Sequence, residues 1–208
     1  MMSKPNQTSV FLCTPDSLNK AFGTLNEKKY RTKQIFEGLY KNFFGDWNDF
    51  TTLPKELRKW LGDNFFIESL TLNKKVKSLD QSTQKLLFQT RDHFPVESVL
   101  MNKSNRYTLC ISTQSGCAMN CAFCATGKLG LNRNLTSWEI VEQVIFTQRS
   151  LHKDGKNLTN IVLMGMGEPL QNFDNVMQFI HIINDPVKLN FGARRITIST
   201  IGLIEPLK

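Results

Sequence analysis

The sequence predicts an α/β fold, in which parallel strands alternate with helices, preceded by a small helical domain. Two strand patterns, at 160–165 and 195–200, flank a helical pattern at 174–184. An earlier strand pattern ends at Thr113, and a helical pattern begins after Thr136. This order implies parallel strands with helices outside them. Three such strands are too few to close a barrel of about eight, so we predict an incomplete (β/α) barrel.

The first part of the chain favours helices. Between 16 and 70, Ile35, Leu39 and Phe43 recur at helical spacing, and Pro54 marks the first turn of a further helix. Four strand patterns follow, KVKSL, KLLFQTR, VESVLM and YTLCIST, separated by polar turns. We therefore predict a helical accessory domain at 1–72, a β-strand extension at 73–105 and the amino-terminal part of the α/β core at 106–208.

Composition limits the class of protein. The 208 residues include 26 Lys+Arg against 18 Asp+Glu, a formal net charge of +8, which is compatible with a polyanionic partner without identifying one. The longest apolar runs are far shorter than the roughly 18 residues that a membrane span needs, and the first residues do not resemble a signal peptide. We expect a cytoplasmic protein with no membrane segment.

The cysteines are the most informative residues. Four of the five fall between Cys110 and Cys124, and an odd total argues against a disulfide framework. Cys117, Cys121 and Cys124 form the pattern C-x3-C-x2-C, whose small neighbours let a short loop turn three thiolates toward one centre. The pattern favours an iron–sulfur cluster with one iron left open for another ligand.

Two alternatives to a cluster remain. A structural zinc site usually has four ligands, and His152 is a candidate fourth, although it lies well downstream on a predicted helix. Buried, unreactive thiols are the other alternative, but free cysteines rarely gather in this way.

A second motif, GMGEP at 165–169, follows the strand pattern at 160–165. Glycines there allow the backbone to approach a ligand, and Glu168 offers a carboxylate to an ammonium group. A simple tight turn is the alternative. Ligands of parallel α/β folds bind at the carboxyl ends of the strands, so we expect this motif, Ser199 and the cysteine loop at one edge.

These residues resemble a known family. C-x3-C-x-F-C, a strand ending in GMGEP and a strand ending in ITIST resemble the radical S-adenosylmethionine superfamily. The wider pattern VESVLM, RYTLCISTQSGCAMNCAFCATGKLGLNRNL and VLMGMGEPLQN is similar to the adenine C-2 methyltransferases that modify ribosomal RNA and some transfer RNAs. The match extends from about Tyr30 to the last residue.

The resemblance implies two cofactors. A [4Fe–4S] cluster would be held by the three loop cysteines, Cys117, Cys121 and Cys124. The open iron would chelate S-adenosylmethionine, which Gly167, Glu168 and Ser199 would help to hold. A reducing electron donor would supply the electron that gives a 5′-deoxyadenosyl radical.

The resemblance also implies two catalytic residues. Glu97 matches the family's proton acceptor, and Cys110 matches a thiol that resolves a protein–RNA intermediate through a transient disulfide bond. Without the family, the alternating strand pattern favours a Glu97 that simply faces water, and an inert buried thiol is the commoner case for Cys110. For the basic accessory domain, packing against the core and contact with RNA are equal alternatives.

The sequence departs from the family at its end. The family's methyl-carrying cysteine belongs to a carboxy-terminal segment, and no cysteine follows Cys124 before Lys208. We therefore expect this chain, as a monomer, not to catalyse the reaction by itself.

Two alternative functions remain: that of the related adenine C-8 methyltransferases, and that of a non-catalytic RNA- or cofactor-binding remnant. Arg133, Arg194 and Arg195 are candidates for RNA phosphate contacts or for solvated surface.

Overall fold

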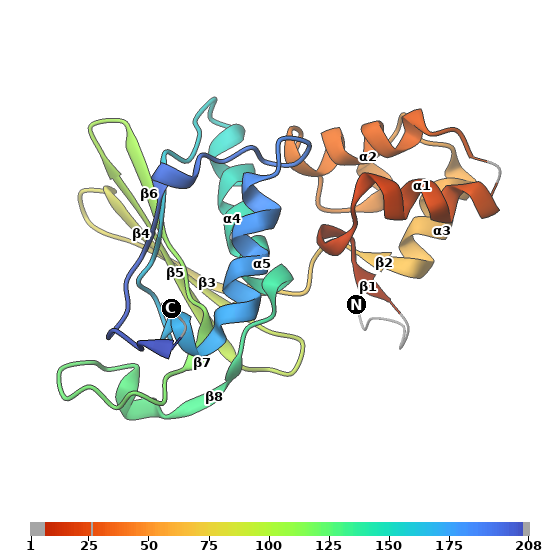
Figure 1. Ribbon diagram of the computed structural model, residues 1–208. Coiled ribbons are helices and arrows are strands. Elements are labelled where there is room, and N and C mark those ends of the chain that lie inside the picture. The colour runs from red at the N-terminus through yellow and green to blue at the C-terminus, as the bar shows by residue number, and fades with distance from the viewer. Residues whose placement is uncertain (1–6, 26, 206–208) are drawn as a thin grey trace.

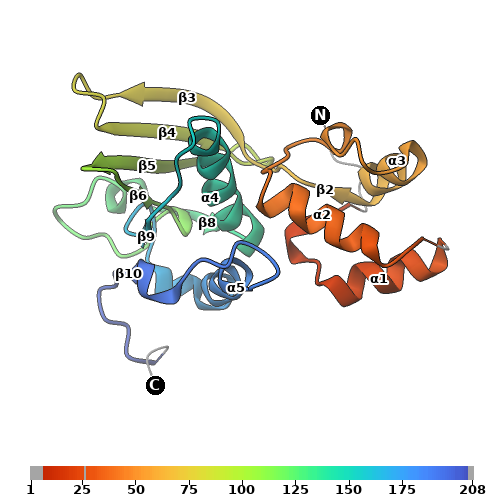
Figure 2. The ribbon, with the colours of Figure 1, turned by 90° about the horizontal axis from the view of Figure 1, so that it is seen from above.

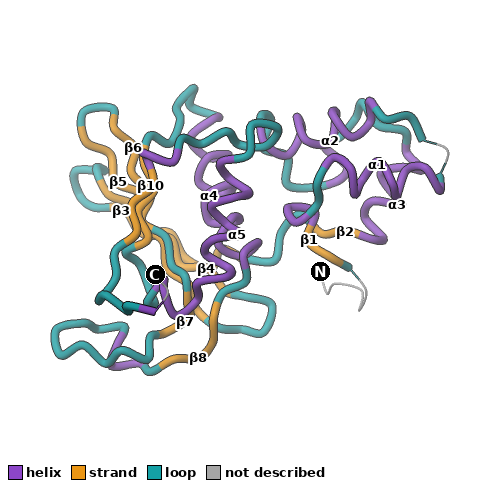
Figure 3. The backbone as a smooth tube through the Cα atoms, in the orientation of Figure 1, coloured by secondary structure: helices purple, strands orange, loops and turns teal. Residues whose placement is uncertain are grey.

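The computed structural model describes residues 7–25 and 27–205. A small helical part, drawn in red and orange, lies beside a larger part in which helices cover a sheet (Figure 1). The two parts also differ in secondary structure, because all strands of the main sheet belong to the larger part (Figure 3). No described helix is long and apolar enough to cross a membrane.

The helical part forms where the apolar spacing predicts it. Its helices are α1 (Pro15–Thr24), α2 (Tyr30–Tyr40) and α3 (Lys55–Asn64). Ile35 and Leu39 of α2 are buried, as is Phe43 just after it. Pro54 is the residue that precedes α3, and the helix buries Leu57 and Leu61.

A short parallel pair of strands that the sequence did not predict closes the helical part. β1 (Thr8–Ser9) pairs with β2 (Phe65–Phe66), so the chain enters and leaves this part at neighbouring points. Two residues per strand are too few to show an alternating pattern. Short 3-10 helices complete the description of the chain: Val10–Leu12, Trp47–Asp49, Gly127–Leu129, Pro169–Asn172 and Ala193–Arg195.

The larger part contains one continuous mixed sheet of six strands in the order β10-β9-β6-β5-β4-β3. β3 through β6 pair antiparallel, whereas β6, β9 and β10 pair parallel, as the alternation of strands and helices predicted. The strands are β3 (Thr71–Lys77), β4 (Thr83–Gln89), β5 (Pro95–Lys103), β6 (Arg106–Cys110), β9 (Asn160–Leu163) and β10 (Ile196–Ile198). No closed barrel forms within the described residues, which agrees with the predicted partial barrel.

Two helices, α4 (Ser137–His152) and α5 (Phe173–Asn184), lie side by side against one face of this sheet (Figures 1 and 2). α4 begins after Thr136, as predicted, with a capping box in which Thr136 and Glu139 bond each other's backbone. The strand residues that point to the helices are buried, as Val96, Ser98 and Leu100 of β5 show. The alternate residues of β5 point to the opposite face, which neither helix covers.

Candidate functional site

The parallel strands end side by side at one edge of the sheet. The backbone N–H of Ile111, just after β6, donates to Val162 O of β9 at 3.0 Å, and Gly165 N donates back to Ile111 O at 3.0 Å. The cysteine loop therefore follows β6 at the same edge where GMGEP follows β9. The sequence-based placement of these two motifs at one edge is confirmed.

The cysteine loop is tightly folded at its base. A two-stranded ribbon of β7 (Gln114–Gly116) and β8 (Leu131–Asn134) closes it. Gly116 has φ +78°, and a Cβ there would lie 1.9 Å from Gly130 O. Cys117 N donates to the same Gly130 O at 2.9 Å. Only glycine fits at the position before the first loop cysteine.

The three loop cysteines share one loop but do not converge in this structure. Cys117 is buried, while Cys121 and Cys124 are half-buried. Among the described residues, no three His, Cys, Asp or Glu side chains gather as metal ligands, and His152 instead packs edge-on against Phe43, with ring centroids 5.3 Å apart.

All five cysteines, including Cys110, are free. The structure therefore does not support a disulfide bond, which we had expected as a transient state of Cys110. In chemical terms, three thiols on a glycine-bounded loop remain a donor set that suits iron and sulfide.

The GMGEP turn is built around glycine. Gly167 has φ +101°, and a Cβ there would lie 2.5 Å from the Cβ of Gln114. Thr113 N donates to Met166 O at 2.9 Å, and Glu168 N donates to the side-chain oxygen of Gln114 at 2.9 Å. The turn is thus pinned to the start of the cysteine loop. Because Gly167 has no side chain, a ligand can approach the backbone of this turn closely.

Glu168 is buried within this edge and accepts hydrogen bonds from its own chain. Its Oε1 accepts from Leu170 N at 2.9 Å and from Thr200 Oγ1 at 2.7 Å, and its Oε2 accepts from Ile201 N at 3.0 Å. The neighbouring Ser199, predicted as a ligand contact, is exposed at the same edge. Sequence analysis did not predict that Thr200 holds this carboxylate. These residues leave a polar, glycine-lined edge that fits an amino-acid group.

The two predicted catalytic residues lie on one face of the sheet. Cys110 of β6 pairs with Val99 of β5, and Glu97 stands two residues before Val99. All three side chains therefore point away from α4, since Ser98 Oγ, between them, bonds Gln143 of that helix at 2.7 Å. Glu97 Oε1 lies 2.6 Å from Lys85 Nζ of β4. Burial raises the pKa of the Cys110 thiol, although a hydrogen bond from the Met164 backbone opposes the shift.

The buried side-chain amide of Gln143, on α4, holds the chain just after β6 at this edge. Gln143 of α4 accepts from Ser112 N at 2.9 Å and donates to Ser112 O at 3.0 Å. Ser112 Oγ in turn donates to Glu97 O at 2.6 Å and accepts from Met166 N at 2.8 Å. Sequence reasoning did not identify Gln143. The available signal was a polar residue beside Val144 on the apolar face of a predicted helix.

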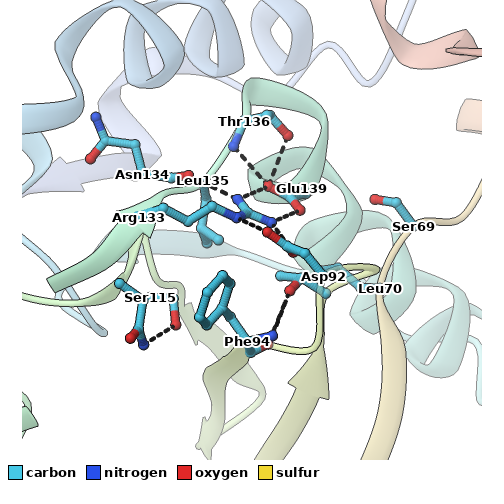
Figure 4. A network of polar contacts seen from close by, with 12 residues as sticks. Ser69, Leu70, Asp92, Phe94, Ser115, Arg133, Asn134, Leu135, Thr136 and Glu139 are labelled. Carbon is cyan, nitrogen blue, oxygen red and sulfur yellow. Dashed lines mark hydrogen bonds and ion pairs between the residues drawn. The ribbon is translucent and has the colours of Figure 1, made fainter.

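An ion-pair network anchors β8, the strand that leaves the cysteine loop (Figure 4). The Arg133 guanidinium donates to Asp92 at 2.6 and 2.7 Å and to Glu139 at 2.9 and 2.8 Å. These bonds hold the pKa of Asp92 well below its usual value. Because both carboxylates occupy it, Arg133 is a structural residue and not the solvated or phosphate-binding side chain that the sequence suggested.

Two family models match the chain, one over its α/β part and one over its helical part. Residues 111–206 match the family model of the radical SAM superfamily, and residues 11–67 match that of the ribosomal RNA large subunit methyltransferase N-terminal domain. A probable dual-specificity RNA methyltransferase RlmN of Staphylococcus saprophyticus is 45% identical over 178 residues, which cover 86% of this chain and 49% of the relative. The chain belongs to the RlmN family of radical SAM proteins.

A further relative and a solved structure give similar matches. The probable RlmN of Geobacillus kaustophilus is 41% identical over 205 residues, 99% of this chain and 56% of the relative. The crystal structure of a radical SAM methyltransferase from Sphaerobacter thermophilus matches with a TM-score of 0.89 and 42% identity, covering 94% of this chain and 57% of that one. The chain spans about half the length of the curated relatives that it matches. Family membership implies a [4Fe–4S] cluster and S-adenosylmethionine as cofactors.

Proposed function

We propose that this chain is the cluster- and cofactor-binding part of a methyltransferase that acts on carbon 2 of adenine in ribosomal RNA and transfer RNA. The observation that carries the proposal is the shared sheet face of Glu97 and Cys110, beside the edge that bears the cysteine loop. An acid–base group and a thiol on one accessible face, next to a cluster loop, are the groups that this methylation needs.

In this proposal the loop thiols of Cys117, Cys121 and Cys124 hold the [4Fe–4S] cluster. When bound, the cluster supplies the electron that makes S-adenosylmethionine able to remove hydrogen from an unactivated carbon. Gly167 lets the backbone approach the methionine end of the ligand, and Glu168 faces its ammonium group. Thr200 orients Glu168 from the end of the third parallel strand, a support that the 2.7 Å hydrogen bond favours. Ser199 contributes a hydroxyl contact to the same ligand.

Glu97 and Cys110 act on the RNA side. Glu97 accepts the proton that leaves carbon 2 when the methyl group takes its place, and Lys85 holds the carboxylate at the sheet surface through the 2.6 Å contact. Cys110 presents a thiol on the same sheet face as Glu97, where it can contact the bound base. The net charge of +8 suits an RNA partner in the cytoplasm, and a reducing donor supplies electrons.

The cofactor half of the proposal is tested by anaerobic iron–sulfide reconstitution, followed by electron paramagnetic resonance of the reduced protein with and without S-adenosylmethionine. We expect a cluster signal that changes when the cofactor is added. Cys121→Ala should bind much less iron, whereas Cys13→Ala, a buried cysteine of the accessory domain, should bind as much as the wild type. A colourless, zinc-loaded protein would contradict the proposal.

The RNA half is tested by mass spectrometry of ribosomal RNA digested after incubation with reconstituted protein, S-adenosylmethionine and reductant. We expect little or no methylation by this chain alone. Any methylated adenosine that does form should carry the new group at carbon 2, and 8-methyladenosine would favour the related C-8 enzymes instead. Salt-dependent RNA binding without any cleavage of S-adenosylmethionine would favour a non-catalytic binding protein.

A further inference from the structure

A groove of about 380 Å³ lies between the accessory domain and the α/β part. Its walls come from the end of α2, the end of α4, and the segments that lead into β9 and β10. Leu158 and Arg195 line it just before these two strands begin, whereas Glu168 and Thr200 follow the same strands at their other ends. The groove is therefore at the sheet edge opposite the cysteine loop, roughly 13 Å away along a four-residue strand.

The side chains that line the groove are uniformly basic or neutral. Lys41, His152 and Arg195 contribute from three different segments, and none of the described lining residues is acidic. Glu37 offsets part of this charge, because its Oε1 lies 3.5 Å from Lys41 Nζ. The ring of His152 packs against Phe43, and the backbone N–H of Arg195 donates to Gly192 O at 2.9 Å.

A buried phenol without a partner also lines the groove. Tyr40 is 3% exposed, and its Oη, although buried, has no hydrogen-bond partner in the structure. Burial raises the pKa of this phenol far above its usual value, with the nearby Cys13 and Asp185 adding to the shift, so the group remains a proton donor. Asn157 lines the groove too, and its Oδ1 already accepts from Gln148 Nε2 at 2.6 Å, which leaves its amide nitrogen as a donor.

Cations and donors in a lining that contains no carboxylate describe a site for an anion. Buried polar groups are nearly always bonded, so the lone Oη of Tyr40 calls for an acceptor that the described residues do not supply. The volume suits a group of about nucleotide size. The rings of Phe43 and Phe191 are buried in the walls and offer no open face on which a base could stack. Phosphate oxygens, and not a base, fit this set of groups.

We propose that the groove binds a phosphate of the RNA backbone, with Lys41 and Arg195 as the cations and with His152 and Tyr40 as further polar contacts. The proposal rests on RNA being the substrate. Because the groove is at the edge opposite the cysteine loop, the phosphate would belong to a part of the RNA remote from the reacting adenine. The contact would position the RNA without reading its sequence.

Fluorescence anisotropy of a labelled ribosomal RNA stem-loop over a series of salt concentrations tests the RNA contact. Lys41→Ala/Arg195→Ala should lower the salt slope by about 2, close to one for each lost phosphate contact, and weaken binding at least about tenfold at low salt. Lys55→Ala/Lys59→Ala, exposed on α3, removes the same charge elsewhere and should change the slope by less than half as much. Equal effects of the two double variants would overturn the proposal.

The phenol is tested separately by Tyr40→Phe, which keeps the ring. It should weaken RNA binding severalfold with an unchanged salt slope, because no charge is lost. Circular dichroism melting of each variant checks that the fold is intact. Unchanged binding by Tyr40→Phe would remove Tyr40 from the site.

Nuclear magnetic resonance of the three histidines separates RNA from free phosphate as the source of the anion. Addition of the stem-loop should shift the ring signals of His152 and leave those of His93 and His181 in place. If inorganic phosphate shifts His152 at micromolar concentration and RNA does not displace it, the site serves free phosphate and the RNA assignment is wrong. Failure of the wild type to bind RNA at all would reject the proposed substrate itself. If the cluster forms normally and the protein binds RNA, but substitutions in the groove do not change RNA binding, only this inference is rejected.

Discussion

The carboxylate of Glu142, in the middle of α4, accepts the backbone N–H of Ser69 at 2.6 Å and that of Leu70 at 2.8 Å. The Ser69 hydroxyl donates to the same carboxylate at 2.7 Å. Two turns later, Arg149 bonds the Phe43 carbonyl and the Glu68 carboxylate. One helix, which begins just after β8 leaves the cysteine loop, therefore ties the accessory domain to the core.

The buried carboxylate makes stability depend on pH. Burial raises the pKa of Glu142 from 4.5 to about 7, although Ser69 and Leu70 donate to it. Between these values the folded protein holds a proton that the unfolded chain has lost, so the free energy of unfolding falls as pH rises. The full difference is about 3 kcal/mol. Urea unfolding from pH 4.5 to 8 should show this decline in the wild type and a flatter profile in Glu142→Gln. Parallel profiles would contradict the assignment.

Most of the fold could be predicted from the sequence, because its elements have strong local patterns. α4 has both a capping box and an apolar face, and the strands alternate. The contacts between distant segments could not be predicted. They are the pairing of the two-residue strands β1 and β2, and the hydrogen bonds of Glu142 with Ser69 and Leu70, which precede it by 73 and 72 residues. A glutamate on a predicted helix normally indicates a solvated face. Nothing in the local pattern shows that Ser69 will cover it.

The Arg133 network gives a second prediction. Arg133→Met leaves Glu139, which is 4% exposed, without its cation and should lower the free energy of unfolding by about 3 kcal/mol. Asp92→Asn removes the half-exposed partner and should cost at most about 1 kcal/mol, since Glu139 still pairs with the guanidinium. Urea unfolding at neutral pH measures both. Equal losses would show that Asp92, and not the buried Glu139, holds this strand.

The part of the candidate site that consists of sequence motifs could be predicted. The three cysteines and GMGEP stand out in the sequence, and the order of strands and helices places both at one edge. The supports of that edge come from single polar residues, such as Gln114, Gln143 and Thr200, whose partners are distant in the chain. Their roles depend on three-dimensional contacts that spacing alone does not encode.

A glycine pair tests the cradle at this edge. Gly167→Ala places a Cβ 2.5 Å from Gln114 and strains a backbone with φ +101°, so we expect a loss of about 2–4 kcal/mol in unfolding free energy. Gly155→Ala is the matched control: its φ is +67°, but the space around its Cβ is open, and it should cost only about 1 kcal/mol. If both variants lost the same stability, backbone strain alone would explain Gly167, and the close contact with Gln114 would be irrelevant.

The environment of Cys110 predicts its reactivity. Burial raises the pKa of this thiol, so at neutral pH it is protonated and a poor nucleophile. Iodoacetamide labelling, followed by mass spectrometry of each cysteine peptide, should give Cys110 a midpoint above the ordinary value of about 8.5. In urea, where the sheet is lost, the midpoint should return to that value. A midpoint at or below 8.5 in the folded protein would contradict the burial effect. The raised midpoint means that Cys110 needs a bound partner or a nearby base to become a thiolate.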